Sequence, residues 1–164
     1  MGYLLKYDES TKVDNDYKCQ TTPKEITFFA KNKIKVVDVV CGQEFSIALD
    51  SNGEVYTFGS NSHQQLGQNL LSNYELNPTR MKFDNNIVKI ECGWYHGLAL
   101  NNLGEVFMWG NPLATYVTIF KDIPLPVQID FQTKINDIVS GSFHMGAITS
   151  DSKLYTWGHN QYVW

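Results

Sequence analysis

Hydrophobic and polar residues alternate in short runs along most of this chain, without the 3.6-residue period of an amphipathic helix. In the run IVKIECG, residues 87–93, the alternation places Val88, Ile90 and Cys92 on one face of a strand and the intervening residues on the other. The runs HGLALN and EVFMWG follow, and the glycine-containing stretch NNLG between them is typical of a hairpin turn. The pattern therefore predicts short antiparallel strands.

This set of strands occurs in three copies about fifty residues apart, so the chain is a repeat protein. The copies are CGQEFSIALDSNGEVYTFGSN, CGWYHGLALNNLGEVFMWGN and SGSFHMGAITSDSKLYTWGHN, which begin at Cys41, Cys92 and Ser140. A fainter copy, GYLLKYD from Gly2 to Asp8, matches only the last strand of the unit. The copies share a first glycine, an alanine, an aromatic residue and the glycine after it: Gly42, Gly93 and Gly141; Ala48, Ala99 and Ala147; Phe58, Trp109 and Trp157; Gly59, Gly110 and Gly158.

A further strand is expected before each copy, where an apolar run follows a proline. These runs begin at Pro23, Pro78 and Pro126, and proline suits an edge strand because it has no N–H to donate. A unit of four antiparallel strands is then a propeller blade. The predicted fold is an all-β partial β-propeller of about three four-stranded blades, divided into an orphan N-terminal strand and loop (1–22), two blades with their loops (23–77 and 78–125) and a third blade with a truncated tail (126–164).

The shared positions have a structural explanation in a propeller, because one sheet has to stack on its neighbours to bury both of its faces. The shared alanines suit inner positions, where blades crowd toward the axis and larger side chains would clash. The shared aromatic residues should be buried between blades farther out, and the glycine after each lets the chain turn sharply. In the third copy Ser152 replaces the glycine of the hairpin turn, so we expect a turn of a different type or a slightly strained one.

Three short motifs recur at this period: Gly-x-x-His, Ala-apolar and Gly-x-apolar-aromatic-x-Trp-Gly. Together they resemble the regulator of chromosome condensation repeat, whose family members are typically seven-bladed propellers. The stretch FGSNSHQQLG also resembles the family's Trp-Gly-x-Asn-x-x-Gly-Gln-Leu-Gly loop, with Phe58 and Gln64 as departures. The resemblance covers about residues 34–160, although the second copy lacks this loop. It implies a ring-shaped propeller that binds proteins, and in some members guanine-nucleotide exchange on a small GTPase.

Composition and charge argue against several classes of function. The net charge is −4 and Arg80 is the one arginine among thirteen basic residues, so no basic stripe favours direct nucleic-acid binding. No run approaches the roughly 18 apolar residues of a membrane span, and the first residues lack the apolar core of a signal peptide. Cys41 and Cys92 share a repeat position, which indicates a small buried residue rather than a disulfide and predicts an intracellular, reducing compartment.

His96 and His144 occupy one repeat position, where the first copy has Phe45. A metal or catalytic site is one interpretation, but equivalent positions lie apart around a ring and no carboxylate or cysteine completes a shared ligand set. Phe45 shows that the imidazole is dispensable, so the sequence favours structural histidines that donate to a backbone carbonyl of their own blade. No nucleophile–base set, phosphate loop or carboxylate pair stands out, and we predict no catalytic, cofactor or metal site and no enzyme.

The long loops are the candidate binding elements, because propellers contact partners through the loops at the ends of their strands. The predicted loops span residues 8–22, 59–77 and 111–125. The last is unusually apolar, so it either folds back on its own blade or contacts a partner. Its candidate contact residues are Leu113, Tyr116, Val117, Ile119 and Phe120.

The sequence favours a non-catalytic protein-interaction or scaffold module within a larger assembly. Part of an exchange factor for a small GTPase is the alternative that the resemblance implies. Three blades cannot close a ring, because propellers have four to eight, and blades ending near Ile34 and Trp157 would expose apolar faces. We therefore expect a further segment or another chain to supply the missing blades, with the strand from Tyr3 to Tyr7 completing one of them.

Overall fold

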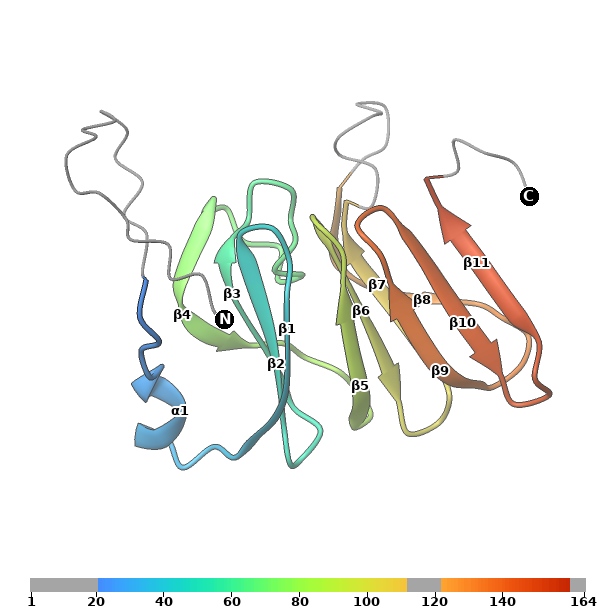
Figure 1. Cartoon of the computed structure of the whole chain (residues 1–164), viewed down its shortest axis with the longest axis horizontal. Helices are drawn as coiled ribbons and strands as arrows, with labels where there is room; N and C mark the ends of the chain where they lie inside the picture. Colours follow the sequence, from blue (N-terminus) through green and yellow to red (C-terminus); the bar gives the residue numbers. More distant parts are fainter. Residues whose placement is uncertain (1–20, 112–121, 160–164) are drawn as a thin grey trace, which may run out of the picture.

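The computed structural model describes residues 21–111 and 122–159, whose regular structure is almost entirely β-strand (Figure 1). One short helix, α1 (Thr27–Lys31), precedes the strands. They form three antiparallel sheets, each pairing its strands in chain order. Sheet A contains β1 (Val36–Cys41), β2 (Phe45–Asp50), β3 (Val55–Ser60) and β4 (Tyr74–Arg80); sheet B contains β5 (Ile87–Cys92), β6 (His96–Asn101), β7 (Val106–Gly110) and β8 (Ile123–Ile129); sheet C contains β9 (Ile135–Ser140), β10 (His144–Thr149) and β11 (Leu154–Gly158).

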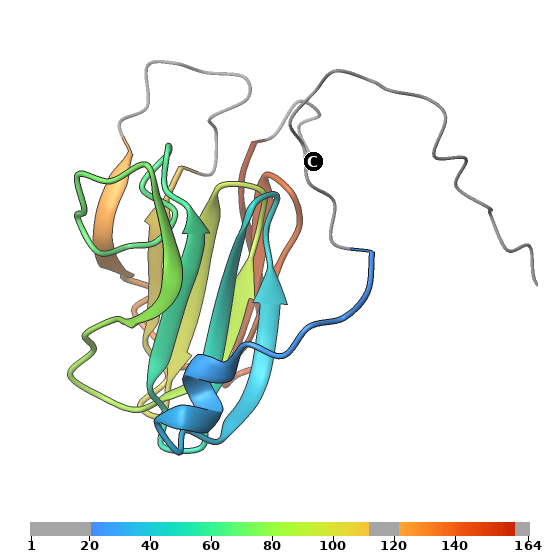
Figure 2. The ribbon, with the colours of Figure 1, turned by 90° about the vertical axis from the view of Figure 1, so that its left-hand side faces the viewer.

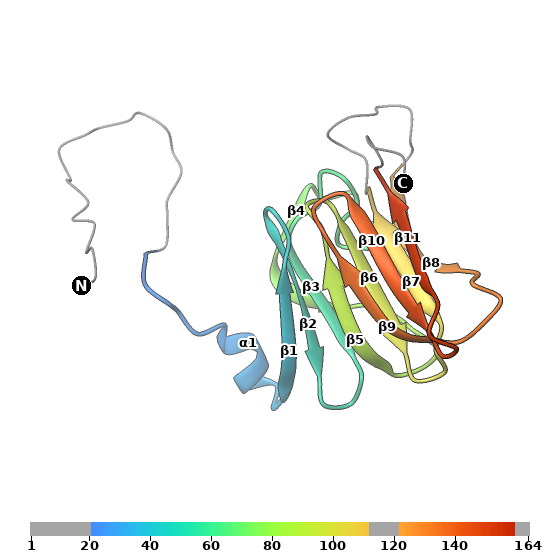
Figure 3. The same ribbon diagram turned by 45° about the vertical axis from the view of Figure 1, so that its right-hand side comes forward.

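The three sheets stand face to face in the order A, B, C, as Figure 3 shows, and Figure 2 looks along the stack. β5 of sheet B contacts β1 and β2 of sheet A, and β9 of sheet C contacts β5 and β6 of sheet B. The first strand of each sheet is therefore the inner strand. Sheets A and C each bury one face on sheet B, and sheet B buries both of its faces. This arrangement confirms the predicted all-β partial propeller.

The outer strands belong to different sheets from those that the sequence predicted. β4 contains Pro78 but pairs with β3, and β8 contains Pro126 but pairs with β7, so each proline strand ends a sheet instead of beginning the next one. The run from Pro23 forms α1 and not a strand. Both proline strands do lie at sheet edges, as predicted. The sheets consequently span residues 36–80, 87–129 and 135–158 in place of the predicted blade boundaries, and within the described residues sheet C has three strands.

A β-bulge in β5 changes which residues share a face. The pairing register with β6 shifts between Ile87 and Lys89, and equivalent shifts occur in sheets A and C. The extra residue buries both Ile87 and Ile90, at 2% and 1% exposure, and leaves Val88 55% exposed. The prediction that Val88 shares a face with Ile90 is therefore wrong, because strict alternation assumes an unbroken ladder.

Two hydrophobic cores fill the spaces between the sheets. Burying each large apolar side chain in them stabilises the fold by roughly 1.5–3 kcal/mol. The first core lies between sheets A and B and includes Phe45, Ile47, Leu49, Val55, Ile87, Ile90 and Trp109. The second lies between sheets B and C and includes Leu98, Leu100, Val106, Ile135, Ile138, Met145 and Ala147.

The shared alanines are all buried, and the shared aromatic residues differ in exposure. Trp109 is fully buried between sheets A and B, where its indole N–H donates to the Gln65 carbonyl at 2.9 Å. Phe58 and Trp157 are half-buried, so the predicted burial is complete for Trp109 and only partial for the other two, of which Trp157 packs against the second core. Trp109 is covered by the loop that carries Leu66, whereas the corresponding part of the loop after β7 lies outside the described residues.

A phenylalanine before each inner strand packs edge-on against the third strand of the same sheet. In sheets B and C this residue lies in the connection from the preceding outer strand, and in sheet A it is supplied by α1. The helix therefore places an aromatic ring where the sequence predicted a strand. The pairs, with their ring-centroid distances, are Phe29–Tyr56 at 5.6 Å, Phe83–Phe107 at 5.4 Å and Phe131–Tyr155 at 5.5 Å.

The hairpin turn of sheet C keeps the conformation of the other two turns despite its serine. Ser152 has a φ of 66°, in the same left-handed region as Gly53 at 82° and Gly104 at 83°. Its N–H donates to the Thr149 carbonyl at 3.0 Å, which matches the corresponding bonds in the other turns. The expectation of a different turn type is therefore wrong, and the expected strain is present, because a left-handed serine costs about 1 kcal/mol.

We expect Trp109→Ala to lower the free energy of unfolding by about 3–5 kcal/mol, because it empties a fully buried site and removes an inter-sheet hydrogen bond. Trp157→Ala should cost less, since that side chain is only half-buried. Urea denaturation followed by circular dichroism measures both values. Leu71→Ala, at a fully exposed residue, is the control and should change stability little. Equal losses for Trp109→Ala and Leu71→Ala would contradict this assignment of the core.

Candidate functional site

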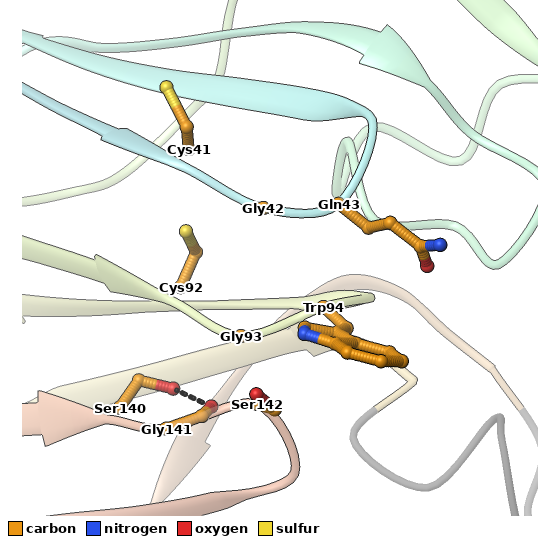
Figure 4. A pocket seen from close by; sticks show the side chains of 9 residues that line it. All are labelled: Cys41, Gly42, Gln43, Cys92, Gly93, Trp94, Ser140, Gly141 and Ser142. Carbon is orange, nitrogen blue, oxygen red and sulfur yellow. Dashed lines mark hydrogen bonds between the residues drawn. The ribbon is translucent and has the colours of Figure 1, made fainter. Parts of the chain in front are cut away.

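The loops that join the first and second strands of each sheet gather at one end of the propeller (Figure 4). Together with the ends of the inner strands they line a pocket of about 360 Å³, which we call the inner-rim pocket. The three sheets contribute equivalent positions to it, so the repeat itself builds the pocket. Its residues are Cys41, Gly42, Gln43, Cys92, Gly93, Trp94, Ser140, Gly141 and Ser142.

Backbone hydrogen bonds connect these loops from one sheet to the next. The Gln43 N–H donates to the Trp94 carbonyl at 3.2 Å, and the Trp94 N–H donates to the Ser142 carbonyl at 3.1 Å. These three residues are repeat equivalents, so the bonds form a regular series across the rim. The series fixes the position of each loop relative to its neighbour.

The first shared glycine is required by two contacts at the rim. A Cβ at Gly93 would overlap the His96 ring and would lie 2.7 Å from the Gly141 carbonyl oxygen of the next sheet. A Cβ at Gly42 would likewise overlap the Phe45 ring and approach the next carbonyl oxygen at 2.8 Å. The ring three residues later therefore lies against the glycine, which explains the Gly-x-x-His and Gly-x-x-Phe spacing.

His96 forms a hydrogen bond between sheets and not within its own sheet. Its side chain is fully buried, and Nε2 lies 2.9 Å from the Ser140 hydroxyl of sheet C. That hydroxyl donates to the Gly141 carbonyl at 3.1 Å, so the arrangement fits an Nε2–H that donates to Ser140. The predicted partner, a carbonyl of the same blade, is wrong because the residue faces the neighbouring sheet. Among the described residues, the other ring nitrogen, Nδ1, has no hydrogen-bond partner.

The two shared histidines have different surroundings. Burial, and secondarily the nearby His144, lowers the pKa of His96 to about 4, so this ring is neutral at pH 7. His144 is exposed on the outer face of sheet C. The described residues contain no group of three or more His, Cys, Asp or Glu side chains that could hold a metal ion. The His96 ring therefore packs between sheets B and C, whereas the His144 ring lies at a free sheet face.

Cys41 and Cys92 are both free thiols at the inner rim. Burial, followed by the proximity of Cys41 and Glu91, raises the pKa of Cys92 to about 12, so its thiol stays protonated. Cys41 is exposed, which contradicts the expectation of a buried residue. The reason is geometric, since sheet A covers Cys92 whereas none of the described residues covers the equivalent position in sheet A.

Aromatic side chains extend along the rim beside the pocket, and we call His63, Trp94, Tyr95 and Phe143 the rim aromatics. Trp94 is 41% exposed and its ring lies 4.8 Å from that of Phe143. Tyr95 contacts Trp94 at 6.4 Å and His63 at 4.7 Å between ring centroids. Sequence reasoning missed this surface, although two adjacent aromatic residues between the glycine and the histidine of CGWYHG were a usable signal.

The structure describes the predicted binding loops to different extents. The loop between β3 and β4 is mostly structural, because Asn61 accepts the Leu66 N–H at 3.2 Å and donates to the Ser72 carbonyl at 2.9 Å. The candidate contact residues between 113 and 120, like the strand from Tyr3 to Tyr7, lie outside the described residues. In the part of the chain that the structure describes, no helix is long and apolar enough to cross a membrane.

Lowering the pH from about 6.5 to about 4 should reduce the free energy of unfolding through His96. The unfolded histidine binds a proton in this range while the folded one, with a pKa of about 4, does not. The difference between this pKa and the ordinary histidine value of 6.5 corresponds to about 3 kcal/mol of unfolding free energy, all of which is lost below pH 4. Denaturation curves across this range measure the slope.

The matched control is the double variant His96→Phe/Ser140→Cys. This variant has a phenylalanine and a cysteine at the B–C interface, the residue types that Phe45 and Cys92 provide at the A–B interface. It therefore has no buried imidazole to protonate. We expect it to fold and to lose most of the pH-dependent slope between 4 and 6.5. The same slope in the double variant as in the original chain would contradict the role of His96.

Comparison with known proteins agrees with this architecture. Two family models of the regulator of chromosome condensation repeat match the chain, one at residues 52–100 and the other at 36–65 and 135–162. These segments cover parts of all three sheets. In the solved structure of human WBSCR16, 26% identical, 76% of this chain superposes on 33% of that chain with a TM-score of 0.67.

Two curated relatives are similar at the level of sequence. The human Regulator of chromosome condensation is 30% identical over 129 residues, which are 75% of this chain and 31% of that protein. A bifunctional serine/threonine-protein kinase/NEDD4-like E3 ubiquitin-protein ligase of Dictyostelium discoideum is 30% identical over 161 residues, 86% of this chain and 8% of that protein. The chain thus spans less than a third of either relative. Its repeats, its sheets and these matches show that the chain belongs to the regulator of chromosome condensation repeat family of β-propellers.

Proposed function

We propose that this chain is a non-catalytic protein-interaction module that binds a partner through the rim aromatics and the inner-rim pocket. The observation that carries the proposal is the exposure of Trp94. Its 41% exposed side chain lies in a loop whose equivalents in the other sheets carry Gln43 and Ser142. An exposed tryptophan beside other aromatic side chains is typical of an energetic hot spot in protein interfaces.

The position of Trp94 is fixed before any partner binds. Both its N–H and its carbonyl take part in the series of backbone bonds between sheets, and its ring packs on Phe143. Little conformational freedom is therefore lost when a partner covers the ring. A preorganised aromatic side chain beside an open pocket favours recognition of a protruding side chain or short loop.

The charge of the chain bears on the kind of partner. The net charge is −4, and the exposed Glu44 lies in the rim loop of sheet A. A basic side chain on the partner would be attracted to this carboxylate and would also stack favourably on the face of Trp94. The surface therefore suits a partner that presents a lysine or arginine near an apolar contact.

We expect Trp94→Ala to weaken partner binding by at least about 30-fold, the equivalent of a 2 kcal/mol hot spot, without loss of folding. Affinity purification from the source cell with the original chain identifies the partner, and calorimetry with the purified partner measures the affinity. Leu103→Ala is the control, since Leu103 is 45% exposed in a hairpin turn at the opposite end of the strands. Equal binding by Trp94→Ala and the original chain would refute the proposed surface.

A second candidate function is a part in guanine-nucleotide exchange on a small GTPase. It is favoured by the similarity to the human Regulator of chromosome condensation, together with the family resemblance of the repeats. Release of a fluorescent nucleotide from a panel of small GTPases tests it, with Trp94→Ala as the comparison. Acceleration that depends on Trp94 would support exchange, and no acceleration of any GTPase by this chain or by a completed propeller would remove it.

A further inference from the structure

The described rim end of the propeller, where the inner-rim pocket lies, carries acidic side chains and no lysine or arginine. Its acidic residues are Glu44, Glu75 and Asp122. The described basic residues lie elsewhere, for example Arg80 and Lys153 at the opposite end of the strands. The described residues of the rim end are 41–45, 59–75, 92–96, 110–111, 122–124, 140–144 and 158–159. This end of the molecule therefore attracts cationic groups.

Trp94 lies in the middle sheet, so the rim loops on both sides of it belong to the described chain. Its ring packs on Phe143 of sheet C, with 4.8 Å between the ring centroids. Phe143 is not part of the pocket lining, whereas Trp94 and Gln43 of sheet A both line the pocket. Figure 4 shows the Gln43 side chain and the indole extending in the same direction from neighbouring loops. The indole is thus supported by Phe143 and open toward the pocket.

We propose that the inner-rim pocket binds the guanidinium group of an arginine that projects from a surface loop of a protein partner. The planar group would lie against the indole of Trp94, between this ring and the Gln43 side chain. The inference rests on the proposed function, because it names the chemical group that the proposed surface recognises. It goes further in selecting arginine over lysine.

The lining of the pocket favours a guanidinium over an ammonium group. A guanidinium is flat, weakly hydrated and stacks on an indole, whereas the ammonium of lysine is compact and strongly hydrated. Its N–H groups can also donate to several acceptors at once. The Gln43 side-chain amide and the Ser142 hydroxyl come from the loops on either side of Trp94, and both residues are exposed. A stacked arginine can therefore donate to acceptors on both sides of the ring.

Glu44 adds a contribution from charge to this contact. It follows Gln43 in the rim loop of sheet A and is exposed. A nearby carboxylate stabilises a bound cation and increases its association rate, and both effects weaken when salt screens them. Binding of the arginine should therefore depend on ionic strength through Glu44 and on the aromatic face through Trp94.

The test uses three short peptides, acetyl-Gly-Leu-Xaa-Gly-amide, in which Xaa is arginine, lysine or citrulline. Citrulline has the shape of arginine, but a neutral urea group replaces the guanidinium. Each peptide is titrated into the original chain, and binding is followed by the NMR signal of the Trp94 indole N–H, which is identified by its loss in Trp94→Ala. We expect the arginine peptide to bind at least about five-fold more tightly than the lysine peptide, and the citrulline peptide to cause no saturable shift.

Variants separate the aromatic contribution from the charged one. Trp94→Ala should abolish the saturable shift that the arginine peptide causes in the Ser142 backbone N–H signal. Glu44→Gln should weaken binding about three-fold and should reduce its dependence on salt between about 0.05 M and about 0.3 M. Asp84→Asn removes an exposed carboxylate at the opposite end of the strands, so it is the matched control and should bind like the original chain. The amide spectrum of each variant establishes that it is folded.

Several results would overturn the proposal. They are a lysine or citrulline peptide that binds as tightly as the arginine peptide, an arginine peptide that causes no saturable shift, and arginine binding that survives Trp94→Ala. The proposed function fails separately, by the partner experiment with Trp94→Ala. A purified partner whose binding requires Trp94, together with an arginine peptide that does not bind, would refute the arginine inference alone.

Discussion

The structure depends on one constraint, which is that each sheet has apolar residues on both faces and cannot bury them by itself. Sheet B is the clearest case, because Trp109 and Ile90 pack toward sheet A while Leu98 and Val106 pack toward sheet C. The fold is therefore made at the interfaces between sheets. The glycines at the rim and the inter-sheet hydrogen bonds of His96 and Trp109 all follow from the need for neighbouring sheets to approach closely.

The same constraint places the candidate site. The rim loops are aligned by bonds between sheets, so the surface around Trp94 exists only where at least two sheets have stacked. A loop of an isolated sheet would lack both its backbone partner and the Phe143 ring. Partner binding at this rim is thus coupled to the stacking of the sheets, and the free energy that orders the loop is supplied by the repeats rather than by the partner.

The sequence was sufficient for the repeat, the strands of each copy and the fold class, because glycines and aromatic residues recur at a fixed period. It was insufficient where the outcome depends on pairing between strands. The bulge at Ile87 and Lys89 and the grouping of the Pro78 strand with sheet A are properties of the ladder, and alternation along one strand does not contain them. The structural role of His96 stays a prediction, and its hydrogen-bond partner was not predictable, because Ser140 lies 44 positions away and belongs to the next repeat. Trp94 was missed because it is not shared between copies.

The bond between His96 and Ser140 has a consequence for how such a chain can change by mutation. The A–B interface contains Phe45 and Cys92 at the equivalent positions, so each junction combines a ring from one repeat with a small group from the next. A histidine introduced without a hydroxyl across the junction leaves a buried N–H unsatisfied, whereas the Ser140 hydroxyl would keep the Gly141 carbonyl as its acceptor opposite a phenylalanine. Whole repeats are therefore not freely interchangeable, because a duplicated or transplanted unit that carries the histidine is accepted only where the next repeat supplies a hydrogen-bond partner for its ring.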